Sequence, residues 1–302
     1  NKKQPDLFVR TTRFGHETGL FLFPWLDTDA SGAPVFGKAI SIKHPFGGTH
    51  PPAGTVIQLG KNIHGFWLKD DKIVHTEFNT SAREFLKIAE ISLPPLPHTA
   101  RNLAVLPNPD GSLEILLEIP DGVIGRPNDF SGRDPRYRPY DGAGIWRGGL
   151  PYVYLYAVTL PKLFAGQPFN PRLVSTTQRE VLESYHQLTV IALGQGKNRG
   201  LLTGSRFGGL HYYHNQAENG IQLDAKVHTV NSDENAHRHP IILPSPISYP
   251  DPITGLSNLI VGGEGALYFY KFTGNFTQTG KPIYNDPIFV LQENADLYAG
   301  TL

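Results

Sequence analysis

The sequence predicts an all-β fold, organised as a single β-propeller of four-stranded blades over residues 1–302. Short apolar segments recur along the chain, and glycine and proline are frequent, at 32 and 26 residues. Aromatic residues make up 11% of the chain. This composition is typical of many short strands joined by tight turns. A repeated unit of four antiparallel strands, arranged radially, forms a propeller.

Composition also limits the chemistry and the partners. The chain has no cysteine, which excludes disulfides, thiolate catalysis and zinc sites that use sulfur. Its formal net charge is zero, so a general attraction to nucleic acid or to a membrane surface is not indicated. No run of about 18 apolar residues is present to span a membrane. The chain does not begin with methionine and residues 1–6 read as a mature or trimmed start, so we expect a protein that is secreted, periplasmic or on the cell surface. We also expect a monomer.

A hairpin segment repeats along the chain. The segments "DLFVRTTRFGHETGLFLFPW" (6–25) and "GLLTGSRFGGLHYYHN" (200–215) each contain an apolar strand, a turn with Arg-Phe-Gly and a second apolar strand. The segments "NLIVGGEGALYFYKFTG" (258–274) and "TVIQLGKNIHGFWLKDD" (55–71) have the same shape, and "LEILLEIPDG" (113–122) starts a further copy. We predict that each copy holds the second and third strands of one blade.

The outer and inner strands are predicted on either side of these hairpins. A fourth strand is expected within 32–42, 165–174 and 280–291, and a first strand precedes a polar turn in "NLAVLPNPDGSLEILLE" and its counterparts. Units begin near residues 6, 54, 98, 187 and 241, which predicts five blades, while the long third unit leaves six or seven open. The first unit lacks a leading strand and "ADLYAGTL" resembles one. We therefore expect residues 296–302 to pair beside residues 6–10 and close the ring without a free edge.

These units resemble the FG-GAP or VCBS-type propeller repeat. The copies most similar to it are 258–274, continued by "GKPIYNDPIFVL" at 280–291, and 200–215. The resemblance implies a propeller fold, and that family includes adhesive, scaffolding and carbohydrate-active proteins, so it does not specify the function. The turns 107–112 and 192–198 lack the run of aspartates with which the repeat binds calcium.

One end of the predicted blades gathers basic and imidazole side chains. In an antiparallel blade, the turn between the second and third strands lies at the same end as the link into the next blade. These turns are predicted to carry Arg13, Lys61, Asp121, Arg206 and Glu264. The links place histidines before the inner strands, namely His50, His98, His186, and His237 with His239. We interpret this as a ring of imidazoles with a second, mainly cationic ring around a ligand site.

A long insertion, residues 121–149, separates the second and third strands of the third unit. It is rich in arginine and aromatic residues, namely Arg126, Arg133, Arg136, Arg138, Arg147, Tyr137, Tyr140 and Trp146. A long irregular loop in a compact domain is more often functional than idle. We expect this insertion to be a lid or one wall of a cleft.

Guanidinium, imidazole and phenol groups in one cleft suit an acidic polysaccharide or oligosaccharide. Arginine binds a carboxylate bidentately, and a carboxylate held in this way stabilises the charge that develops when the adjacent proton is removed. Histidine and tyrosine then act as base and acid. This is β-elimination, the reaction of polysaccharide lyases. The predicted catalytic residues are His186, Tyr185, His239 and Arg206. The predicted substrate-binding residues are Arg13, Lys61, His50, His98, His237, Arg136, Arg138, Tyr137 and Trp146.

Other interpretations stay open at this point. A glycoside hydrolase would need paired carboxylates, and the candidates are Asp121, Glu183, Glu234, Glu264 and Asp296. A non-catalytic glycan- or protein-binding propeller would have several equivalent shallow pockets. His211 and His214 lie three apart on a strand, so they point to opposite sides and one is expected to have a structural role. We expect no cofactor. The metal alternatives are calcium at 27–32 and a divalent ion at His186, His237 and His239.

Overall fold

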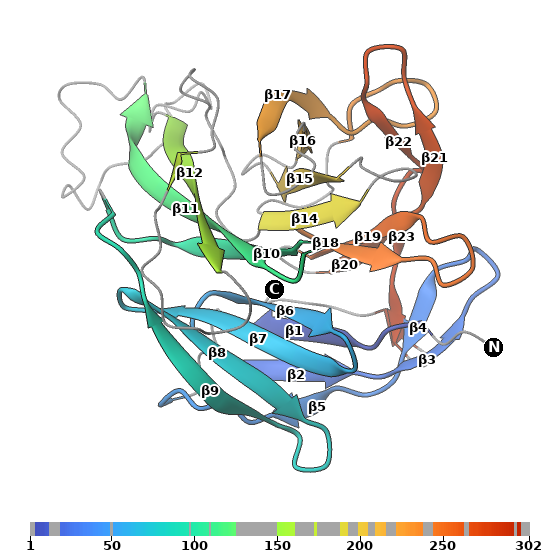
Figure 1. The fold of residues 1–302 in the computed structure, drawn as a ribbon. Helices are drawn as coiled ribbons and strands as arrows, with labels where there is room; N and C mark the ends of the chain where they lie inside the picture. The colour runs from blue at the N-terminus through green and yellow to red at the C-terminus, as the bar shows by residue number, and fades with distance from the viewer. Residues whose placement is uncertain are drawn as a thin grey trace, which may run out of the picture.

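The computed structural model describes residues 4–11, 19–48, 51–96, 98–108, 110–124, 150–160, 172–173, 188–192, 199–204, 209–215, 222–237, 244–262, 266–292 and 295–296. These residues form β-strands, turns and loops and contain no α-helix, which confirms the all-β prediction (Figure 1). Accordingly, no helix with the length and apolar character of a membrane span is present in the described part of the chain.

Five sheets consist of antiparallel strands in the order predicted for propeller blades. We number them first to fifth along the chain. Their strands are β1 (Leu7–Thr11), β2 (Gly19–Phe23) and β5 (Ile40–Ile42) in the first sheet; β6 (Gly54–Leu59), β7 (Asn62–Lys69), β8 (Lys72–Asn79) and β9 (Glu84–Ser92) in the second; β10 (Asn102–Pro107), β11 (Leu113–Ile124), β12 (Leu150–Leu160) and β13 (Arg172–Leu173) in the third; β14 (Leu188–Ala192), β15 (Arg199–Gly204), β16 (Leu210–Asn215) and β17 (Leu223–His228) in the fourth; and β18 (Ser245–Pro250), β19 (Ser257–Gly262), β20 (Leu267–Tyr270) and β23 (Ile288–Phe289) in the fifth.

The predicted hairpin repeat is present, with one error of register. The hairpins β15–β16 and β19–β20 are the second and third strands of their sheets, and β1–β2 corresponds to them in a first sheet that has three described strands. Segment 55–71 instead forms β6 and β7, the first and second strands of the second sheet. Its alignment with the other hairpins was therefore wrong by one strand.

Hydrophobic clusters join these five sheets in cyclic order. The first and second sheets share a cluster that contains Leu20 and Trp67, and the second and third share one with Phe66 and Ile115. The remaining junctions, from third to fourth, fourth to fifth and fifth to first, are formed by Leu116 with Leu201, Tyr212 with Tyr270, and Ile260 with Leu7. The third sheet packs against the second sheet on one face and against the fourth sheet on the other. Because both faces are buried, its strands contain continuously apolar runs, as in the segment 115–117 of β11.

Close packing between sheets requires a glycine at the end of β15. A Cβ atom added to Gly204 would collide with the backbone carbonyl of Pro244, the residue just before β18. The fourth and fifth sheets therefore approach each other at the backbone of these two residues, which leaves no room for a side chain.

Two small sheets lie beside the five. The strands β21 (Phe272–Phe276) and β22 (Pro282–Tyr284) form a hairpin between β20 and β23. The other sheet contains β3 (Trp25–Thr28), β4 (Pro34–Phe36), β24 (Leu291–Gln292) and β25 (Ala295–Asp296), and β24 pairs with β4 in parallel.

Closure of the ring by residues 296–302 beside residues 6–10 is not confirmed. Residues 295–296 pair with β24 and not with β1, so they lie in a different sheet from the first strand. Residues 297–302 lie outside the described residues, and the closing strand and the total number of blades stay predictions. A direct contact between the N-terminal segment and the fifth sheet does exist, because the Tyr249 hydroxyl donates a hydrogen bond to the Pro5 carbonyl at 2.8 Å.

The polar turns are held by aspartates that bond within their own turn. Oδ1 of Asp29, in the segment "DTDASG", accepts hydrogen bonds from the amide of Ser31 at 2.9 Å, from its hydroxyl at 2.5 Å and from the amide of Ala33 at 2.9 Å. Asp110 accepts from the amide and hydroxyl of Ser112 in the same way. These are Asx turns, and calcium binding at 27–32 stays a prediction.

Candidate functional site

Many of the predicted site residues lie outside the described residues. These are Arg13, His50, Arg136, Tyr137, Arg138, Trp146, Tyr185, His186, Arg206 and His239, together with Glu183 and Glu264. The described candidates are Lys61, His98, Glu234 and His237, and the backbones of Asp121 and Asp296.

The predicted position of Lys61 was wrong. Lys61 lies in the turn between β6 and β7, which are the first and second strands of the second sheet. Because successive turns of an antiparallel sheet alternate between its two ends, Lys61 lies at the end opposite to the link segments. The turn between the second and third strands of this sheet carries Asp70 and Asp71 instead, with Asp70 at a positive φ of 54°. Ligand binding by Lys61 stays a prediction.

The structure describes three of the five acids proposed for a hydrolase, namely Asp121, Glu234 and Asp296. Asp121 belongs to β11, where the pairing with β12 shifts register between Pro120 and Gly122, so it occupies a β-bulge and not an open turn. Glu234 lies in the turn after β17, at a positive φ of 61°, and Asp296 ends β25. These three residues come from three different structural elements.

The β11–β12 hairpin extends beyond the rest of the third sheet. Asn102, at the start of β10, pairs with Glu118 of β11, while β11 continues to Ile124 and pairs with β12 as far as Leu150. The strands therefore form an arm, residues 119–124 and 150–154, that has no partner in β10 (Figure 1). The predicted insertion 121–149 is thus partly strand, and its residues 125–149 lie outside the described residues.

The arm and a predicted histidine link lie at the same end of the third sheet. The arm begins where β10 begins, and the segment that enters β10 carries His98 and Arg101. Both side chains are exposed. The arm and the link with His98 therefore share one end of the third sheet, and the association of the arginines of 125–149 with this histidine stays a prediction.

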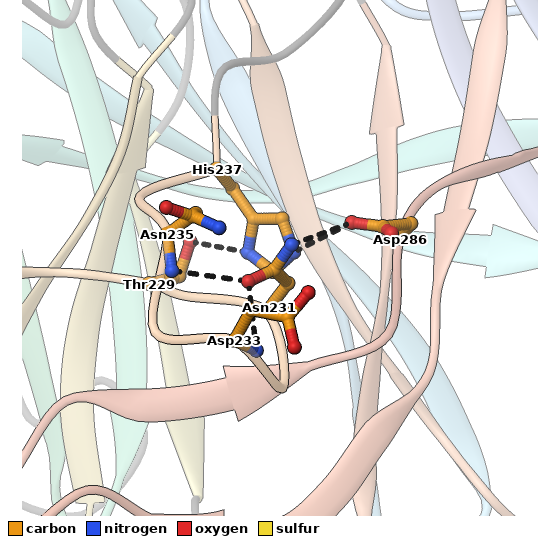
Figure 2. Close-up of polar contacts among 6 residues, drawn as sticks. All are labelled: Thr229, Asn231, Asp233, Asn235, His237 and Asp286. Carbon is orange, nitrogen blue, oxygen red and sulfur yellow. Dashed lines mark hydrogen bonds and ion pairs between the residues drawn. The ribbon is translucent and has the colours of Figure 1, made fainter.

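His237, in contrast, is buried in a polar cluster between the fourth and fifth sheets (Figure 2). Its Nδ1 lies 3.3 Å from the Thr229 hydroxyl, and its ring meets that of Tyr270 edge to face with centroids 5.4 Å apart. Its Nε2 lies 4.0 Å from Oδ1 of Asp286 and has no hydrogen-bond partner. The His237 side chain is 4% exposed, whereas that of Asp286 is 78% exposed.

The loop that carries His237 is ordered by one asparagine. The Asn231 side-chain oxygen accepts hydrogen bonds from the amides of Asp233 at 3.1 Å and Asn235 at 3.0 Å, which closes the turn (Figure 2). The Asn231 side-chain nitrogen donates to Asp286 at 3.3 Å, and the amide of His237 donates to the Thr229 carbonyl at 2.9 Å. Asn231 therefore holds both the loop and the carboxylate opposite the imidazole.

Burial lowers the pKa of His237, and the negative charge of Asp286 opposes this shift. Thr229 is fully buried, so a substrate cannot reach the hydroxyl next to His237, and a threonine nucleophile activated by this histidine is excluded. The cluster therefore supports a structural role for His237, whereas Asp286, Asp233 and Asn235 are exposed to solvent.

The strand histidines behave as predicted. His214 lies in β16, and its Nε2 is 2.8 Å from the carbonyl oxygen of Gly280 in the β21–β22 hairpin, which is a structural contact between sheets. His211 is buried, and its ring lies 4.6 Å, centroid to centroid, from that of His228 in β17.

A buried carboxyl group that the sequence analysis missed lies at the base of the arm. Glu118 is 1% exposed and accepts a hydrogen bond from the Asn102 side chain at 3.0 Å. Burial raises the pKa of Glu118 to about 7, although the Asn102 hydrogen bond and the charge of Arg101 act in the opposite direction. The signal in the sequence was a glutamate in an otherwise apolar strand. Glu114, on the same face, is also buried, but four strand residues span about 13 Å, which is too far for a hydrolase pair.

Within the described ranges, no three His, Asp or Glu side chains gather closely enough to hold a metal ion. The proposed divalent site at His186, His237 and His239 includes two residues outside those ranges, so it stays a prediction.

Comparisons with known proteins identify no family. No protein-family model matches the chain, and no curated protein matches it. Solved structures with a similar chain arrangement include an α-L-arabinanase from Penicillium chrysogenum complexed with arabinobiose, at 12% identity over 92% of this chain and 75% of that one, with a TM-score of 0.46. They also include a functionally unknown protein from Desulfotomaculum acetoxidans (13% identity, 89% and 62%, TM-score 0.36) and a provisionally assigned 6-phosphogluconolactonase from Bacteroides fragilis (13% identity, 94% and 94%, TM-score 0.40). These similarities assign no activity to the chain.

Proposed function

We propose that this chain is a carbohydrate-active β-propeller that acts on an acidic polysaccharide, as a polysaccharide lyase. The observation that carries the proposal is the β11–β12 arm, which stands at the end of the third sheet where the link with His98 and Arg101 enters β10. Residues 125–149, which connect the two strands of the arm, hold five arginines and four aromatic residues. Guanidinium groups bind carboxylates, and aromatic rings stack on sugar rings.

In this proposal, Arg206 or an arginine of residues 125–149 holds the uronate carboxylate. His186, His239 or Tyr185 removes the adjacent proton, because a neutral imidazole is a competent base near neutral pH. The electron pair then expels the glycosidic oxygen, which takes up a proton from an acid in the site. The products are an unsaturated uronate at one new end and a free hydroxyl at the other.

A non-catalytic glycan-binding propeller is the second candidate, and one observation favours it. His237, one of the link histidines, is buried against Thr229 and Tyr270 instead of being exposed to a ligand. At least this member of the predicted imidazole ring therefore stabilises the fold, as it would in a binding module.

The test incubates the purified protein with polygalacturonate, alginate, hyaluronan and heparin. A lyase produces an ultraviolet-absorbing unsaturated product, a hydrolase produces reducing ends without this absorbance, and a binding module retains the polymer without cleaving it. Arg136→Gln combined with Arg138→Gln should weaken the effect, whereas Arg83→Gln, in the turn between β8 and β9 at the opposite end of the second sheet, is the matched control. If none of the four polymers is cleaved or retained, the proposed function is wrong.

A further inference from the structure

Arg10 of β1 lies on a packed face of the first sheet. Side chains alternate between the two faces of a strand. Leu7 and Val9 pack in the cluster shared with the fifth sheet, whereas Phe8 meets Phe78 of the second sheet with ring centroids 5.2 Å apart. Arg10 therefore shares the face of Phe8, which is turned toward the second sheet, and its side chain is partly buried.

The guanidinium group of Arg10 reaches the segment that enters the second sheet. Its Nη1 donates a hydrogen bond to the carbonyl oxygen of Pro51 at 3.5 Å, which is long for such a bond. Pro51 is buried and lies shortly before β6, the first strand of that sheet. The guanidinium group is thus held at the junction of the first and second sheets, at the end where the link enters β6.

Within the described ranges, the positive charge of Arg10 has no carboxylate partner, and the long bond to Pro51 is its polar contact. A guanidinium group has several N–H donors, so most of them stay available to another acceptor. Burial lowers the pKa of Arg10, with no described anion acting in the opposite direction. A charge that is partly removed from water without an anion is costly. Such an arrangement suits an arginine whose anion is supplied by a ligand.

We propose that Arg10 binds a carboxylate group of the acidic polysaccharide at the junction of the first and second sheets. The inference rests on the proposed function, because it assumes that the ligand is a polyuronate. Both oxygens of a carboxylate match the fork of N–H donors in a guanidinium group. The links into β6 and β10 enter the first strands of neighbouring sheets, and these two strands contact each other. One long polymer can therefore contact both Arg10 and the arm.

A binding role and a structural role of Arg10 predict opposite effects on stability. If its charge has no partner in the free protein, an apolar side chain of similar length removes a desolvation cost. Arg10→Met should then unfold at the same temperature as the wild-type protein or at a higher one. If Arg10 instead stabilises the link through Pro51, the same substitution should lower the unfolding temperature.

The experiment measures binding of oligogalacturonate and of an alginate oligomer by calorimetry, and thermal unfolding of the same proteins without ligand. Arg10→Met should weaken binding about tenfold or more, because a charge-assisted bond is lost. Arg10→Lys keeps the charge but loses the fork, so it should weaken binding to a smaller extent. Arg83→Met replaces an exposed arginine between β8 and β9 and should leave the affinity unchanged. A carboxyl-reduced oligomer of the same length should not distinguish Arg10→Met from the wild-type protein.

The outcomes separate the two proposals. If neither acidic oligomer binds the wild-type protein, and the four polymers also fail, the proposed function and this inference fail together. If an oligomer binds but Arg10→Met leaves its affinity unchanged, the inference alone is wrong. Where a polymer is retained and the oligomers are not, its retention by Arg10→Met decides in the same way. The inference is also wrong if Arg10→Met does not fold or unfolds at a clearly lower temperature, because Arg10 then has a structural role. Equal affinities of Arg10→Lys and the wild-type protein would contradict the bidentate contact.

Discussion

The imidazole rings of His64 and His75 stack inside the second sheet, with Nδ1 of His64 3.0 Å from Nε2 of His75. His75 also stacks on Phe66, and both histidines are buried. Burial, and secondarily the proximity of His64, lower the pKa of His75 to about 4. His75 is therefore stable as a neutral ring in contact with His64.

We expect this pair to make the protein less stable in mild acid. The folded-state pKa of His75 is lower than the unfolded value, so the unfolded chain binds more protons between about pH 6.5 and about pH 4. The free energy of unfolding should fall by up to about 3 kcal/mol as the pH decreases through this range. Urea unfolding at several pH values measures it. His75→Phe should flatten this dependence, whereas exposed His98→Gln should not; an unchanged slope in His75→Phe would contradict the assignment.

Gly204→Ala should destabilise the junction of the fourth and fifth sheets. The added methyl group meets the Pro244 carbonyl, which belongs to the backbone and cannot rotate away. Overpacking of this kind costs about 1–3 kcal/mol. Thermal unfolding measures the effect. Gly47→Ala is the matched control, because a Cβ atom there meets nothing within 4 Å; an equal effect of the two substitutions would show that the approach of β15 to Pro244 is not the cause.

Asp286→Asn should lower the pKa of His237 further. Asp286 raises that pKa against the larger effect of burial, so loss of its charge leaves burial unopposed. The Hε1 resonance of His237, assigned by comparison with His237→Gln, reports the titration. Asp233→Asn removes a charge from the loop that carries His237 and is the control. A rise in the pKa of His237 on loss of Asp286 would contradict the geometry of the cluster.

Replacement of residues 125–149 by a short turn that contains glycine should leave the fold intact. The arm ends with the Ile124–Leu150 pair, which a tight turn can connect. On the proposed function, the shortened protein should no longer retain or cleave an acidic polysaccharide. Circular dichroism and unfolding curves check the fold, and the polymer panel checks the activity. Unchanged activity would place the ligand site elsewhere, and loss of folding would show that the segment is structural.

Sequence reasoning succeeded where the repeat carried the information. The hairpins β1–β2, β15–β16 and β19–β20 align because each has the same alternation of apolar strands and a polar turn. It failed at 55–71, because a hairpin of first and second strands has the same local pattern as one of second and third strands. The order of strands in a sheet decides between them, and that is a property of the tertiary structure.

The candidate site was less predictable than the fold. Glu118 could not be recognised because its burial depends on the fourth sheet, which begins some seventy residues later. His237 was identified as a link histidine, but its environment comes from Asp286 and Tyr270, which a local pattern does not place. Interactions of this kind become visible only when distant strands are packed together.

The cluster between the fifth and first sheets has a consequence for synthesis of the chain. Leu7 and Phe23 are synthesised before Ile260 and Phe269, which follow more than two hundred positions later, and the four pack in one cluster. Until then one apolar face of the first sheet stays exposed to solvent and to other nascent chains. Contacts of such sequence separation slow folding, so the first sheet is the part of the molecule whose maturation must wait for the last.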